Sequence, residues 1–114
     1  IKDTIHTREV DTAYMRGVDL LQKRRYAKAL YILHEYHDRN TIVTLLSLGH
    51  DAQALEMLDG LEQTATVEYL KAVACSRLGR KAEGREHFLT ACGMDERMQY
   101  RGNLDPEITE LLKE

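Results

Sequence analysis

Two histidines, His34 and His37, are the side chains in this sequence best suited to binding a metal ion. They stand three residues apart next to Asp38, and histidines with this spacing share one face of a helix. The zinc-protease motif places its two histidines four residues apart instead, and no third ligand follows nearby. The other histidines are scattered and are expected to face solvent: His6, His50 and His87. We therefore expect a solvated helix end at this position and no metal site.

The two cysteines, Cys75 and Cys92, are predicted to be free, buried, small apolar thiols. If each lies late in one helix of an antiparallel pair, the two are far apart, whereas a disulfide needs α-carbons within about 7 Å. No motif places either cysteine with a histidine, and the sequence contains no glycine-rich phosphate loop and no serine elbow. We expect no enzymatic activity and no cofactor.

Basic residues gather at two predicted turns, Lys23-Arg24-Arg25-Lys28 and Arg77-Arg80-Lys81-Arg85. They could contact phosphate if both turns lay along one edge of the molecule. Cations at the ends of helices also stabilise the helix dipole, and the formal net charge of −3 gives no overall attraction to nucleic acid or anionic lipid. We expect no nucleic-acid partner. Direct membrane insertion is not expected either, because no apolar run approaches the roughly 20 residues that span a bilayer.

The length and composition of the chain fit one helical domain. Its 114 residues are 43% hydrophobic and 31% charged, with one proline and no tryptophan. The sequence starts at Ile1, which suggests a processed or excised fragment. The compartment stays open between the cytoplasm and a bacterial periplasm or cell envelope.

A repeated turn organises the chain. The stretch from Leu48 to Ala54 reappears from Leu78 to Gly84 and, less cleanly, from Lys23 to Ala29. In the first two copies a glycine follows a leucine, and we expect this glycine to end one helix in the left-handed conformation before the next helix starts. A repeated turn of this kind predicts repeated helix pairs.

Six helices are predicted between residues 11 and 94. The first two have apolar residues at three- and four-residue steps, and they end near Lys23 and after Tyr36. The other four should begin at a capping residue or turn and stop at a glycine. The third helix is expected from Thr41 to Gly49, and the fourth from Asp51 to Gly60. The fifth is expected from Thr64 or Thr66 to Gly79, and the sixth from Gly79 to Gly93.

The ends of the chain differ from this region. Residues 1–10 are predicted to be a loose lead-in segment. Within residues 95–114, the stretch from Met98 to Gly102 shows no helical face and is expected to be irregular. Asp105 followed by Pro106 predicts the start of a terminal helix. Its apolar stripe would cover the open end of a stack of helices: Ile108, Leu111 and Leu112.

The helix pairs resemble the tetratricopeptide repeat family over roughly residues 11–94. The first unit has the small, aromatic and large core residues of that family at Gly17, Tyr26, Ala29 and Leu33. The last unit has the corresponding residues at Tyr69, Ala72, Gly84, Phe88 and Ala91. The resemblance implies an all-α fold, a short right-handed α-solenoid of three antiparallel helix hairpins with a C-terminal capping helix.

The middle unit departs from the family pattern. The alanine after each turn recurs after 25 residues, from Ala27 to Ala52, and after 30 residues, from Ala52 to Ala82, which is short of the family's 34. The closing proline of the family and its tryptophan are also absent. We expect a short third helix and a compact domain.

In this family the first helix of each pair lines a concave groove. By that resemblance, eight residues are implied to contact a partner: Tyr14, Val18, Gln22, Val43, Ser47, Tyr69, Val73 and Arg77. The alternative is that Tyr14 and Tyr69 pack against neighbouring helices or the tail. A clamp for the carboxylate of a chaperone tail would need lysine and asparagine where Tyr14 and Val18 stand, so that subtype is rejected.

The resemblance therefore implies a non-catalytic protein-interaction or scaffold module that binds a peptide or protein segment on this groove. The alternative is a structural spacer or dimerisation domain of a larger protein, with self-association left open. The partner is not named by any feature of the sequence.

Overall fold

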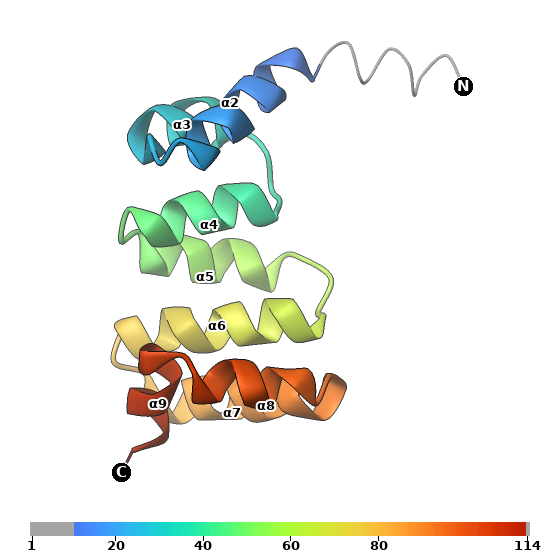
Figure 1. The fold of residues 1–114 in the computed structure, drawn as a ribbon, viewed down its shortest axis with the longest axis vertical. Coiled ribbons are helices and arrows are strands. Elements are labelled where there is room, and N and C mark those ends of the chain that lie inside the picture. The colour runs from blue at the N-terminus through green and yellow to red at the C-terminus, as the bar shows by residue number, and fades with distance from the viewer. Residues whose placement is uncertain (1–10, 114) are drawn as a thin grey trace, which may run out of the picture. The chain divides into compact units, whose positions relative to one another are not determined.

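The computed structural model describes residues 11–113, which form eight α-helices and no β-strand (Figure 1). The predicted all-α class is confirmed for this part of the chain. The lead-in segment predicted for residues 1–10 lies outside the described residues. The helices are α2 (Thr12–Gln22), α3 (Tyr26–Leu33), α4 (Arg39–Ser47), α5 (Asp51–Asp59), α6 (Ala65–Arg77), α7 (Lys81–Met94), α8 (Arg97–Asn103) and α9 (Pro106–Leu112).

The chain divides into two compact units, Ile1–Gly49 and His50–Glu114. In unit 1, α2 and α3 form a helix pair, and α4 packs against both of them. In unit 2, α6 packs against α5 on one side and pairs with α7 on the other, while α9 contacts both α6 and α7. Helices that follow one another in the chain therefore pack together within each unit.

The predicted turn recurs with a left-handed residue at each of its three places. Gly49 has a φ of 79° and Gly79 a φ of 76°, as expected for glycines that end helices. In the less clean copy the same position is held by Arg24, whose φ is 60°. The amide of Arg25 donates to the carbonyl of Leu20 at 2.9 Å. This bond closes the turn after α2, even though no glycine is present there.

Two of the predicted helix starts are confirmed and two are wrong. Thr64 caps α6 through its hydroxyl, and Asp105 caps α9 with Pro106 in the first turn. Helix α4 starts earlier than predicted, because the cap is Asp38, which accepts from the amide of Thr41 at 3.1 Å. Asp51 is the first residue of α5 rather than its cap.

Helix α3 ends at Leu33, three residues before the predicted end at Tyr36. The last carbonyls of this helix accept bonds from outside it. The carbonyl of Leu33 accepts from the amide of Tyr36 at 2.8 Å and from the hydroxyl of Thr41 at 2.9 Å. Thr41 is thus fully buried as a partner of the end of α3 rather than as the cap of α4.

Two further predictions about helix limits are wrong. Gly93 does not stop α7, which continues to Met94. The segment from Met98 to Gly102, predicted to be irregular, lies within α8. Gly102 is buried against Phe88, and Met98 packs on the same cluster. Such tertiary contacts stabilise a short helix that has no apolar stripe of its own.

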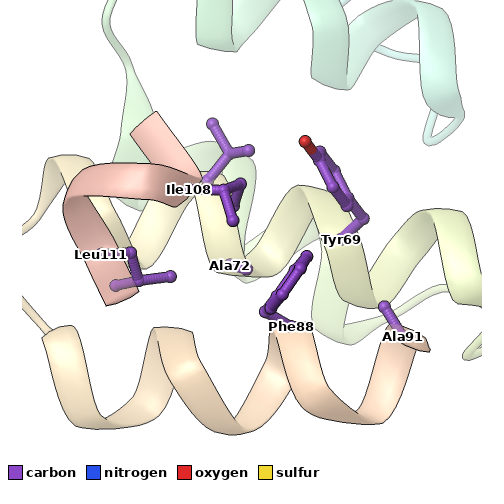
Figure 2. Close-up of a cluster of buried hydrophobic side chains, with 7 residues drawn as sticks. Tyr69, Ala72, Phe88, Ala91, Ile108 and Leu111 are labelled. Carbon is purple, nitrogen blue, oxygen red and sulfur yellow. The ribbon is translucent and has the colours of Figure 1, made fainter. Parts of the chain in front are cut away.

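The core of unit 2 forms where α6, α7 and α9 meet (Figure 2). Its buried members are Tyr69, Ala72, Val73, Phe88, Ala91, Ile108 and Leu111. Small residues bring the paired helices close together, as the sequence predicted. A Cβ atom added at Gly17 would lie 2.7 Å from Cδ2 of Leu33 across the α2–α3 pair.

Candidate functional site

A shallow hollow of about 360 Å³, open to solvent, lies in unit 1 between α2 and the first turn of α4, and it is called the cavity of unit 1 below. Three of the residues predicted to contact a partner line it, namely Tyr14, Val18 and Gln22, which follow one another along one face of α2. The other lining residues were not predicted: Met15, Asp19 and Asn40. Its lining combines apolar side chains with an aromatic hydroxyl, two amides and a carboxylate.

The hydroxyl of Tyr14 is held by two hydrogen bonds at the edge of this cavity. It donates to Oδ2 of Asp38 at 2.5 Å and accepts from Nδ2 of Asn40 at 2.7 Å. The ring of Tyr14 packs against that of Tyr36, with centroids 4.7 Å apart. Burial, followed by the bond to Asp38, raises the pKa of Tyr14 above its ordinary value. The tyrosine is therefore a fixed, neutral wall of the cavity.

The tyrosine predicted for the groove of the last repeat has a different environment. Tyr69 is 1% exposed and lies in the core of unit 2, where its hydroxyl donates to Oδ2 of Asp105 at 2.7 Å. The guanidinium carbon of Arg101 lies 4.3 Å from the centroid of the ring. Burial is the main cause that raises the pKa of Tyr69. These contacts match the alternative stated for Tyr69 in the sequence analysis, in which the tyrosine packs against the C-terminal tail.

The neighbouring predicted residues on α6 also contact the chain itself. Val73 is buried in the same core. Arg77 binds Glu107 through two nitrogens, at 2.7 Å and 2.9 Å, and binds Oδ1 of Asp51 at 3.1 Å. The bonds to Glu107 are the main cause that raises the pKa of Arg77. In unit 2, the face of α6 that was predicted to bind a partner is thus covered by α9.

The two residues predicted on α4, Val43 and Ser47, are exposed and do not line the cavity. The predicted set therefore separates into three groups. One group lines the cavity of unit 1, one is exposed on α4, and one contacts α9 in unit 2.

The two helix pairs correspond position by position, with an offset of 55 residues. Tyr14 corresponds to Tyr69, and each donates to an aspartate that caps a later helix packed on its pair, Asp38 for α4 and Asp105 for α9. Gln22 likewise corresponds to Arg77. The sequence contains a signal for these hydrogen-bond partners, because an aspartate directly precedes α4 and another directly precedes α9.

The two corresponding places differ in the polar side chains beside the tyrosine. In unit 2, Arg77 and Glu107 form an ion pair beside the tyrosine. In unit 1, Gln22 stands at the position of Arg77, and Asn40 follows its capping aspartate by two residues, as Glu107 does. Unit 1 thus has two neutral amide side chains, Gln22 and Asn40, where unit 2 has an ion pair, and both amides line the cavity.

His34 and His37 do not share a helix face, because α3 ends before them. His34 is exposed and contacts the carbonyl of Tyr31 through Nδ1 at 2.8 Å. Among residues 11–113, no group of three or more histidine, cysteine or acidic residues could hold a metal ion. His50 is exposed, and His6 lies outside the described residues. The prediction for His87 is wrong, since it is only partly exposed and contacts Glu68 at 3.0 Å.

Both cysteines are free, as predicted, but burial of both thiols was also predicted and is wrong for Cys92. Cys75 is buried and Cys92 is partly exposed, and burial is the main cause that raises the pKa of each thiol. A raised pKa keeps the thiol protonated and poorly nucleophilic near neutral pH.

Three of the basic residues at the predicted turns bind groups of the chain itself, namely Lys23, Arg77 and Arg85. Lys23 pairs with Asp19 at 2.9 Å, and Arg85 donates to the carbonyls of Leu111 and Lys113 at 3.0 Å and 2.7 Å. Together with the ion pairs of Arg77, these bonds favour a structural role for the clusters. No helix of residues 11–113 is long and apolar enough to cross a membrane.

The chain was compared with known protein families, curated proteins and solved structures, and none of them matches it.

Proposed function

We propose that this chain is a non-catalytic protein-interaction module and that the cavity of unit 1 binds a short peptide segment of a partner. The observation that supports this proposal most directly is the position of Tyr14, Val18 and Gln22. These three residues were selected as partner-binding from sequence, and all three line one cavity.

The lining of the cavity favours a peptide with one apolar side chain. Met15 and Val18 provide an apolar surface, and the amides of Gln22 and Asn40 are suited to hydrogen bonds with a peptide backbone. A volume of about 360 Å³ is at the lower end for ligand pockets. The ligand is therefore a side chain with its flanking backbone rather than a long segment.

The fixed position of Tyr14 supports binding with little loss of conformational entropy. Its hydroxyl already has both of its partners, Asp38 and Asn40, and its ring already contacts Tyr36. A preorganised aromatic wall does not have to be ordered when the ligand binds.

We also propose that the helix pairs are tetratricopeptide-like repeats of a short right-handed solenoid, with three hairpins and α9 as the capping helix. The shared turn and the constant offset between the two pairs support this reading. The hydrogen bond from a tyrosine to the aspartate that caps a later helix occurs in both units, and it supports this reading as well.

The experiment is a selection of short peptides on the full chain, followed by titration of the selected peptide. Val18→Arg would place a large cation in the cavity, and we expect it to weaken binding at least about tenfold. Ala13→Arg is the matched control, since residue 13 is exposed on the same helix and does not line the cavity. Equal affinities of the two variants and the parent chain would contradict the proposal.

A second candidate function is self-association, as in a spacer or dimerisation domain. Exposed large apolar side chains in unit 2 favour it: Leu89, Met94, Tyr100 and Leu104. Sedimentation of the chain at increasing concentration distinguishes the two functions. A monomer at all concentrations would exclude dimerisation, and it leaves peptide binding to be decided by the titration.

A further inference from the structure

Helix α9 contacts the face of the α6–α7 pair through two apolar anchors. Ile108 and Leu111 are both fully buried, and they are three residues apart on one side of the helix. Figure 2 shows Leu111 directed toward the space between α6 and α7, and both anchors belong to the same buried cluster as Phe88 and Ala72. The anchors thus fill an apolar groove that belongs to the helix pair.

The shape of the groove matches the second anchor closely. A Cβ atom added at Gly84 of α7 would lie 2.8 Å from Cδ1 of Leu111. The absence of a side chain at residue 84 therefore provides the space that the leucine occupies. The groove therefore accepts an aliphatic side chain beside Gly84 through close packing.

Polar groups of the helix pair bind the two ends of α9. At its start, Tyr69 donates to Asp105, Arg77 donates to both carboxylate oxygens of Glu107, and the hydroxyl of Ser76 donates to the carbonyl of Glu107 at 3.1 Å. At its end, Arg85 donates to two carbonyls. The groove therefore recognises the direction of the bound helix and the acidic residues that begin it.

We propose that the groove of α6 and α7 is a binding site for a short amphipathic helix with an acidic start, and that α9 is its intramolecular occupant. The partner helix has aspartate as its N-cap and glutamate two residues later. It has aliphatic residues three and six positions after the aspartate, as at Asp105, Glu107, Ile108 and Leu111. This site is separate from the cavity of unit 1, so either proposal can fail alone.

The proposal requires α9 to leave the groove while α6 and α7 stay folded. Helix α9 has seven residues and follows α8 through Leu104, which is exposed, and Asp105, whose backbone is extended. Helices this short are marginal without tertiary contacts, and local opening of such elements is common. A partner with the same pattern would compete for the groove that opens.

The first test is native-state hydrogen exchange on the unmodified full chain. We expect the amides of α9 to exchange at least about tenfold faster than the buried amides of α6 and α7, because α9 opens by itself. Equal protection of all three helices would overturn the proposal, since the groove would then open only when unit 2 unfolds.

The second test uses a labelled peptide with the sequence of residues 104–113. The full-length variant Ile108→Ala/Leu111→Ala, in which the intramolecular helix is weakened, should bind this peptide, whereas the parent chain should bind it at least about tenfold more weakly. In the same background, Arg77→Met should weaken binding about tenfold, because it removes the bonds to the glutamate.

Arg97→Met is the matched control, since Arg97 pairs with Asp95 away from the groove, and it should leave the affinity unchanged. Failure of a folded variant to bind the peptide, or binding that does not depend on Arg77, would overturn the proposal. Circular dichroism checks that the variant is folded. If the double variant unfolds, Leu111→Ala alone replaces it, and the exchange experiment on the unmodified chain decides independently.

Discussion

Tyr69 donates its hydroxyl proton to Asp105 at 2.7 Å, and the same aspartate accepts from the amide of Glu107 as the cap of α9. One carboxylate thus starts a helix and fastens it to the preceding helix pair. The same relationship joins Tyr14 and Asp38 in unit 1. In each unit, a tyrosine on the first helix of the pair is therefore bonded to the residue that caps a later packed helix.

Removal of this hydroxyl should destabilise unit 2. Tyr69→Phe keeps the buried ring but loses the bond to a carboxylate, and we expect a loss of about 1.5 kcal/mol in the free energy of unfolding. Urea unfolding followed by circular dichroism measures it. Tyr100→Phe is the control, because Tyr100 is exposed. The same loss in both variants would show that the bond to Asp105 has no special role.

Alkaline pH should weaken the same contact. The pKa of Tyr69 is raised above its ordinary value of 10.0, mainly by burial. The stability contributed by the protonated hydroxyl is fully present below pH 10 and is lost as the pH rises through the folded pKa. We expect the melting temperature to fall above this pH, and to fall less steeply in Tyr69→Phe. Parallel curves for the two proteins would contradict this assignment.

Two glycines of unit 2 should respond in opposite ways to alanine. A Cβ atom at Gly102 would lie 2.5 Å from the buried ring of Phe88, whereas one at Gly93 within α7 would meet nothing within 4 Å. Gly102→Ala should lower stability by about 1–3 kcal/mol through overpacking. Gly93→Ala should raise it by about 0.5–1 kcal/mol through helix propensity. Denaturant midpoints measure both changes, and a stabilising Gly102→Ala would mean that α8 is not packed on Phe88.

The turn after α2 contains a strained residue that can be relieved. Arg24 has a φ of 60°, a conformation that costs roughly 1–2 kcal/mol outside glycine. Glycine loses more entropy on folding, so Arg24→Gly should give a net gain of about 0.5 kcal/mol. Thermal unfolding measures this gain. Gly79→Ala is the opposite exchange in the corresponding turn, and it should destabilise. A stabilising effect of Gly79→Ala would show that these turns do not need the left-handed residue.

The turns and most helices could be predicted because their signals are local. A glycine after a leucine at Gly49 and Gly79 needs only its neighbours to end a helix, and Asp105 with Pro106 needs only the next turn to start one. The start of α4 was missed because Asp38 and Thr41 are both good caps. The choice between them depends on the bond of Thr41 to Leu33, which forms only in the packed unit.

The candidate site could be predicted only in part for the same reason. Tyr14, Val18 and Gln22 follow one another on a single helix, so helical spacing was enough to group them. Asn40 comes from another helix, and no spacing rule relates it to Tyr14. Tyr69 has the same place in its helix pair as Tyr14, yet α9 covers it, because Ile108 and Leu111 pack into one buried cluster with it.

The most direct measurement of the proposed function is a nuclear magnetic resonance titration of the full chain with its selected peptide. If the cavity of unit 1 is the binding site, the largest amide shifts should fall on residues 14–22 of α2 and on Asn40, and they should disappear in Val18→Arg. Shifts confined to unit 2, or an unchanged pattern in Val18→Arg, would contradict peptide binding at this cavity.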